Sequence, residues 1–168
     1  MDDGDLAIRW TVRVAMALYV MSLVLSGLAG TRQSWLVAAR LAWSLGCLAY
    51  LAHVACAFEY AHHWSHPDAY AATARQTEEI VGLKFGGGLY ANYAFTLVWM
   101  LDVCWWWAGI ERYRARPRWV AWTVYGFLGF IAVNATVVFP TGAIRWFGIG
   151  ACVLLAAVWG RRLFAGRA

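Results

Sequence analysis

The chain is poor in charge. Aspartate, glutamate, lysine and arginine make up 14% of its 168 residues, whereas an ordinary soluble domain carries about a quarter. A soluble fold needs a charged surface, and this composition has too few charged residues to form such a surface. Instead, 62% of the residues are hydrophobic and stand in long uncharged runs, which is typical of membrane-spanning helices. The sequence therefore predicts an all-α integral membrane bundle that forms a single transmembrane domain over residues 1–168.

The sequence has no CxxC pair of cysteines and contains a single lysine. All four cysteines lie inside apolar runs and none belongs to a CxxC pair, which indicates neither a zinc ribbon nor a disulfide framework: Cys47, Cys56, Cys104 and Cys152. Lys84 is the single lysine beside 13 arginines. Because the arginines stand at the ends of apolar runs, they indicate orientation in a bilayer rather than binding to nucleic acid. We expect the lipid bilayer as a partner and no nucleic acid.

Five segments approach or reach the length that crosses about 30 Å of hydrocarbon at about 1.5 Å per residue. They cover residues 14–30, 36–61, 88–110, 119–139 and 144–163. The first follows the acidic leader MDDGD, where a signal peptide needs basic residues. We therefore expect it to remain as a helix of the bundle.

Between the second and third segments, the sequence predicts a short helix over 67–81 that lies along the membrane interface. Ser65 and Asp68 have the spacing of a capping box, and Pro67 suits the first turn of a helix. Three glycines at 86–88 then allow the chain to turn sharply into the next span.

The distribution of basic residues predicts the orientation. If the loop between the third and fourth spans is cytoplasmic, nine basic residues lie inside: Arg32, Arg40, Arg112, Arg114, Arg116, Arg118, Arg161, Arg162 and Arg167. Five then lie outside: Arg9, Arg13, Arg75, Lys84 and Arg145. This asymmetry satisfies the positive-inside rule. We expect a multi-pass protein of the inner (plasma) membrane, with its N-terminus outside and its C-terminus in the cytoplasm.

A cluster of histidines follows the second span and is the main candidate site. On an uninterrupted helix, the side chains of Glu59, His62, His63 and His66 fall within roughly a 100° arc. A divalent ion such as zinc, iron or copper is held by three or four such nitrogen and oxygen donors. The spacing therefore predicts a metal site on the outer face. One feature of the sequence weighs against the full set, because His66 precedes a proline and such residues avoid the helical conformation.

Other polar residues are expected near this cluster. Their positions along the spans place them at the same outer level, where unpaired polar groups are costly. We expect a shared cavity in which His53, Asn92, Tyr93 and Asn134 bind a cofactor or support the metal ligands. Glu78 and Glu79 on the interfacial helix are candidate acid/base residues. Asp102, deep in the third span, is expected to pair with an arginine of the inner loop.

Three kinds of function are compatible with these features. The first is a metal-binding protein or metal-dependent enzyme with its site on the outer face. The second is a subunit of a respiratory complex that binds haem b or a quinone; haem would need a second axial ligand from a homo-oligomer, from a larger complex or from a methionine. The third is a non-catalytic accessory subunit, in which water or lipid headgroups satisfy the histidines. The sequence leaves these three open.

Overall fold

The computed structural model describes residues 3–30 and 32–165, with side chains up to residue 162. These residues form helices joined by short turns, and no strand occurs among them. The elements are α1 (Asp3–Ala29), α2 (Gln33–Cys56), the π-helix η1 (Ala57–Ala61), α3 (His66–Val81), α4 (Gly88–Ala108), α5 (Ile110–Arg114), α6 (Arg118–Val133), the π-helix η2 (Asn134–Val138) and α7 (Ala143–Ala165). The predicted all-α class is confirmed.

Four helices are long and apolar enough to cross a membrane: Asp3–Ala29, Gln33–Ala61, Arg118–Val138 and Ala143–Arg162. The predicted third span, residues 88–110, forms α4, which has 21 residues but is not among these four. This helix contains the polar residues Asn92 and Asp102. The structure therefore supports four candidate spans, and the count of five is not confirmed.

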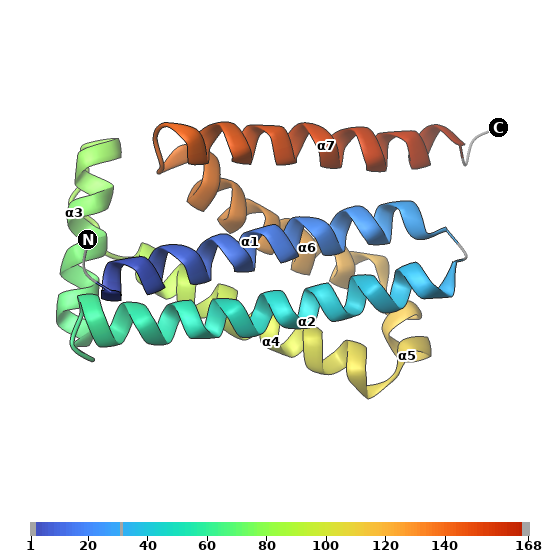
Figure 1. Cartoon of the computed structure of the whole chain (residues 1–168), viewed down its shortest axis with the longest axis horizontal. Coiled ribbons are helices and arrows are strands. Elements are labelled where there is room, and N and C mark those ends of the chain that lie inside the picture. Colours follow the sequence, from blue (N-terminus) through green and yellow to red (C-terminus); the bar gives the residue numbers. More distant parts are fainter. Residues whose placement is uncertain (1–2, 31, 166–168) are drawn as a thin grey trace.

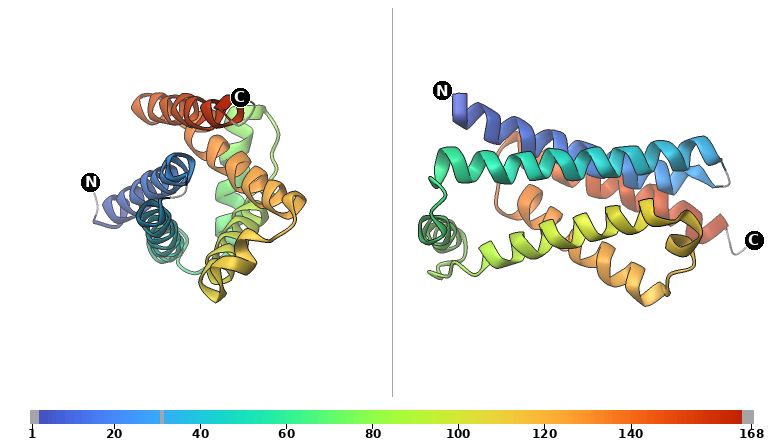
Figure 2. Two further views of the ribbon diagram at one scale, coloured as in Figure 1. Left: turned by 90° about the vertical axis from the view of Figure 1, so that its right-hand side faces the viewer. Right: turned by 90° about the horizontal axis from the view of Figure 1, so that it is seen from below.

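The long helices run side by side, and α3 lies across one end of them (Figure 1). A second view, from below, shows α3 end-on while α1, α2 and α4 run in the plane of the picture (Figure 2). We call residues 62–66, which contain three histidines and join η1 to α3, the histidine loop, and this end of the molecule the histidine end. The α1–α2 turn, α5 and the end of α7 lie at the opposite, arginine end. The predicted helix over 67–81 is present as α3.

Local signals explain where α3 begins and ends. The Ser65 hydroxyl accepts a hydrogen bond from the main-chain N–H of Asp68 at 3.3 Å, as the predicted cap requires. Pro67 occupies the first turn. At the other end Gly82 adopts a left-handed conformation with φ 73°, which glycine accepts without strain.

The core is aromatic. Trp43 of α2 and Trp99 of α4 are almost fully buried, with ring centroids 5.2 Å apart. Tyr19 of α1 contacts both rings. Gly46 makes room for this packing, since a Cβ atom there would lie 3.1 Å from the Trp99 ring. The α1–α2 pair is further joined by a buried hydrogen bond from the Ser22 hydroxyl to a main-chain oxygen of α2.

The last helix packs more loosely than the others. Near its start, Gly148 lies so close to η2 that a Cβ atom would stand 2.6 Å from the main-chain oxygen of Thr136. Two positions on, Gly150 has nothing within 4 Å of a Cβ atom. Most side chains of α7 are exposed, including Trp146 and Phe147. The helix is therefore held to the bundle at a few close contacts.

Candidate functional site

The histidine loop departs from the helix that the sequence predicted. The α-helix gives way to η1 at Ala57, and His62 caps this π-helix. His63 and Trp64 then adopt φ angles of 48° and 58°, which are uncommon for residues other than glycine. The helical face on which Glu59, His62, His63 and His66 were expected to converge is therefore interrupted.

The predicted metal ligands consequently point to different partners. Glu59 accepts a hydrogen bond from the Trp64 indole at 2.6 Å, His62 packs edge-on against Phe58, and His63 is exposed. Within the described part of the chain, no group of three or more His, Cys, Asp or Glu side chains is placed to hold a metal ion. The residues present do not fit the metal centre that the sequence predicted.

A cavity of about 260 Å³ lies at the histidine end instead. Its walls come from α2, η1 and its capping residue, α3 and α4, and they mix aromatic rings with groups that form hydrogen bonds. The lining residues that carry this character are Tyr50, His53, Phe58, His62, Gln76, Asn92, Tyr93 and Thr96. Such a lining suits a ligand that has both a flat apolar face and polar edges.

His53 is held in one orientation at this cavity. Its Nδ1 lies 3.0 Å from the main-chain oxygen of Ile8 in α1. A carbonyl oxygen only accepts hydrogen bonds, so Nδ1 carries the proton in the neutral ring. Its Nε2 has no hydrogen-bond partner among the described residues and is left as an acceptor.

The structure brings together some of the other predicted residues. Asn92 and Tyr93 line the cavity, and the Tyr93 hydroxyl lies 3.0 Å from Nδ1 of His66. Asn134 does not line it, because the cavity walls include no residue of α6 or η2; its amide donates to the main-chain oxygen of Phe130. Sequence reasoning missed Tyr50, Phe58 and Gln76, which carry no polar motif or regular spacing that would mark them as a set.

The two candidate acid/base residues lie away from the cavity. Glu78 and Glu79 are exposed on α3 and do not line the cavity. The face of α3 that covers it carries Ala72, Thr73 and Gln76. The spacing of the cavity-lining residues on α3 leaves Glu78 on another side of the helix, whereas Glu79, three residues after Gln76, lies near the same face but further along the helix.

A second polar cluster lies near the arginine end, around Asp102. This carboxylate is buried and accepts a hydrogen bond of 2.7 Å from Nη1 of Arg116. It also accepts hydrogen bonds of 2.9 Å from the indole of Trp43 and the hydroxyl of Tyr113. The expected pairing with an inner-loop arginine is thus present. The indole and phenol partners were not foreseen, because they come from α2 and α5.

The cation of this pair is enclosed by aromatic rings. The guanidinium carbon of Arg116 lies 3.8 Å from the centroid of the Tyr113 ring and 5.1 Å from that of Tyr125. Burial, together with the neighbouring Tyr125 and Asp102, raises the pKa of Tyr113 well above its usual range. Its hydroxyl therefore stays protonated and remains a donor to Asp102. This cluster joins α2, α4, α5 and α6, and we interpret its role as holding these helices together.

Comparisons with protein-family models, with curated proteins and with solved structures find no match to this chain.

Proposed function

We propose that this protein spans a membrane and binds a small ring-shaped ligand of the quinone class in the cavity at the histidine end. The observation that carries the proposal is the lining of that cavity, in which Tyr50, Phe58 and Tyr93 supply aromatic surface. Two imidazoles, His53 and His62, stand among these rings. Quinones combine a flat apolar ring with an oxygen at each end, which is the pattern such a lining accommodates.

The polar groups match the two redox forms of a quinone. Asn92 and Gln76 carry amide N–H donors for the oxygens of the oxidised ring. The acceptor nitrogen of His53 suits a hydroxyl of the reduced ring, since a hydroxyl donates. A ligand dissolved in the bilayer also has a short route to a cavity at the end of apolar helices.

The size of the cavity favours one ring over a larger cofactor. Sites for drug-sized ligands have volumes of roughly 300–1,000 Å³, and this cavity is slightly smaller. Both lining histidines come from one stretch of chain, His53 in α2 and His62 just after η1. Haem b with two protein ligands needs a second ligand from a facing wall, and the lining contains no methionine or further histidine.

The same proposal includes an orientation in the plasma membrane. Of the basic residues that the structure describes, eight belong to the arginine end and its loops, and five belong to the other side. The positive-inside rule then places the arginine end in the cytoplasm and the ligand cavity on the outer face.

Binding of a decyl-tailed benzoquinone to the protein in lipid nanodiscs tests the proposal, with calorimetry as the measurement. We expect saturable binding that weakens about fivefold in Asn92→Ala and in His62→Ala, because one hydrogen bond contributes about 1 kcal/mol. His63→Ala is the matched control, since this neighbouring histidine is exposed and does not line the cavity. It should bind like the wild type.

Two results would contradict the proposal. One is uptake of the quinone that never saturates and is the same in all variants, which indicates partition into lipid. The other is stoichiometric metal in protein purified without a histidine tag and lost in His62→Ala, which would restore the metal site. Metal analysis of the same preparations separates these outcomes.

A further inference from the structure

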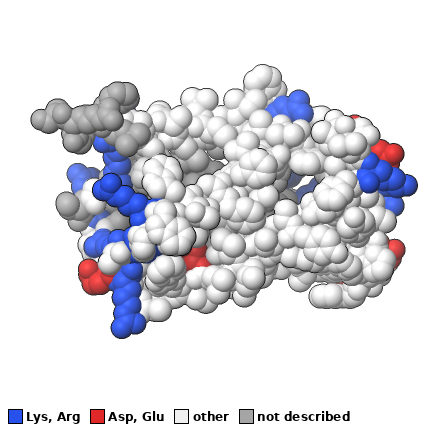
Figure 3. Space-filling model, turned by 180° about the vertical axis from the view of Figure 1, so that it is seen from behind, with Lys and Arg blue, Asp and Glu red and all other residues white. Residues whose placement is uncertain are grey.

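The arginine end carries more basic than acidic side chains among its described residues. Its described residues include eight arginines: Arg32, Arg40, Arg112, Arg114, Arg116, Arg118, Arg161 and Arg162. The acids at this end are Asp102, which is bound to Arg116, and the exposed Glu111. A space-filling view shows several basic side chains gathered there (Figure 3). Most of these arginines are exposed, but Arg40 is half-buried and set deeper.

The position of Arg40 along its helix sets its depth. The continuous helix Gln33–Ala61 has 29 residues and is about 43 Å long at about 1.5 Å per residue. Centred on about 30 Å of hydrocarbon, it extends about 6–7 Å beyond each edge. Arg40 stands seven residues after Gln33, or about 10 Å along the helix. Its Cα atom therefore lies a few ångströms inside the edge of the hydrocarbon, where a charge needs a partner.

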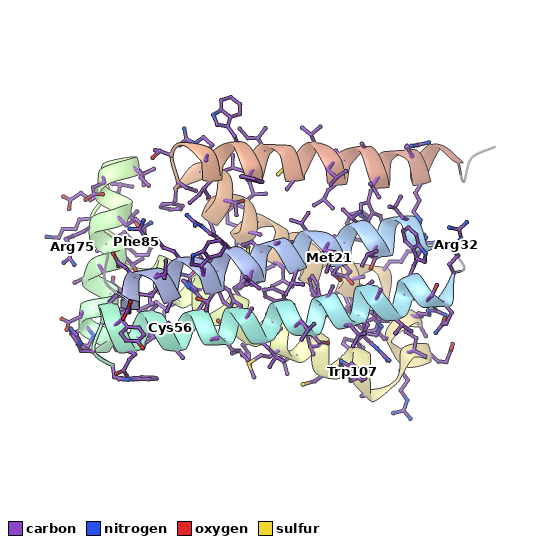
Figure 4. All side chains as sticks on the ribbon, in the orientation of Figure 1. Met21, Arg32, Cys56, Arg75, Phe85 and Trp107 are labelled. Atoms are coloured by element: carbon purple, nitrogen blue, oxygen red, sulfur yellow. The ribbon has the colours of Figure 1, made fainter. Side chains whose placement is uncertain are left out.

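The described residues supply an aromatic surface for this charge but no acid. The guanidinium carbon of Arg40 lies 4.0 Å from the ring centroid of Trp107 in α4. Trp107, labelled toward the arginine end in Figure 4, is itself fixed by donating its indole N–H to the Ser44 hydroxyl at 2.8 Å. The Nε atom of Arg40 is buried, and no described residue accepts its hydrogen bond. The ion pairs of the described residues, Arg9–Asp5 and Arg116–Asp102, do not include it.

We propose that Arg40, seated on Trp107, binds the phosphate of an anionic phospholipid in the leaflet at the arginine end. A guanidinium presents several N–H donors in a plane and matches phosphate oxygens. Val37 and Leu41, which flank Arg40 on α2, are exposed and offer apolar surface to the acyl chains. The depth of the site favours a lipid phosphate over a soluble one, and the exposed arginines around it attract anionic headgroups.

The test uses nanodiscs of phosphatidylcholine with rising fractions of phosphatidylglycerol, and native mass spectrometry counts the phosphatidylglycerol retained per protein. Arg40→Gln should bind it about fivefold more weakly, the usual effect of one basic residue near a membrane surface. Arg162→Gln is the matched control, because Arg162 is exposed at the same end and also lies over an indole, that of Trp159 at 5.6 Å. Its affinity should change by less than that of Arg40→Gln.

One further variant and one control ligand complete the test of lipid binding at Arg40. Arg40→Lys keeps the charge but not the planar guanidinium, and it should lose part of the affinity even if Arg40→Gln fails to fold. Glycerol phosphate added to phosphatidylcholine nanodiscs should not bind. Unchanged affinity in both Arg40 variants overturns the proposal, and so does an equal loss in Arg162→Gln. Saturable binding of glycerol phosphate would assign the site to a soluble ligand instead.

Discussion

Removal of the Arg116 side chain tests the buried cluster around Asp102. The two side chains are 6% and 1% exposed, and their charged atoms are 2.7 Å apart. Breaking a buried ion pair on one side costs about 3–5 kcal/mol, because the remaining charge has no partner. We therefore expect Arg116→Ala to lower the free energy of unfolding by about 3–5 kcal/mol. The hydrogen bonds from Trp43 and Tyr113 remain and should keep the loss near the lower value.

The measurement is unfolding in mixed micelles as the fraction of dodecyl sulfate rises, followed by circular dichroism. Arg114→Ala and Arg118→Ala are the controls, since both arginines are exposed and stand two residues from Arg116. Each should change the free energy of unfolding by no more than about 0.5 kcal/mol. If all three variants unfold alike, the cluster does not hold the arginine end together.

A double-mutant cycle separates the ion pair from its surroundings. Asp102→Asn alone leaves Arg116 buried without its counter-charge, and we again expect a loss of about 3–5 kcal/mol. The double variant should lose clearly less than the sum of the two single losses, because neither charge is then left alone. Losses that simply add would show that the two residues act independently and would refute the reasoning.

Three further predictions concern local packing, pH and a helix cap. Gly148→Ala should reduce thermal stability because its Cβ atom meets main-chain atoms of η2, whereas Gly150→Ala has open space and should raise the melting temperature slightly, because alanine favours a helix more than glycine does. The free energy of unfolding should fall as pH rises above about 10, since the unfolded state then loses the Tyr113 proton that the folded state retains at its raised pKa. Tyr113→Phe should make this alkaline slope shallower than in the wild type. Ser65→Ala should destabilise α3 by about 0.5–2 kcal/mol, because the helix loses its N-terminal cap. Amide hydrogen exchange across residues 66–81 should then be faster than in the wild type, and equal exchange would contradict the role of the cap.

The sequence predicted the helices better than the sites. Apolar runs predicted the bounds of the long helices within a few residues, with one large miss at α1, which begins at Asp3 rather than at residue 14. Asp3 and Asp5 explain this, because acidic residues stabilise the first turn of a helix. The four predicted metal ligands do not share one helical face, for a local reason. It assumed a regular α-helix through a stretch where a π-helix and two left-handed residues occur.

The sequence alone determined that the chain is helical, that its arginines gather at one end and that Asp102 needs a buried cation, because these follow from composition, spacing and the cost of an unpaired charge. The partners of each side chain came only from the tertiary structure. Trp43 reaches Asp102 across 59 positions of sequence, and Trp107 reaches Ser44 across 63. Such contacts depend on how helices pack against one another, which no pattern within a single helix records. The cavity at the histidine end likewise exists only where four separate segments meet.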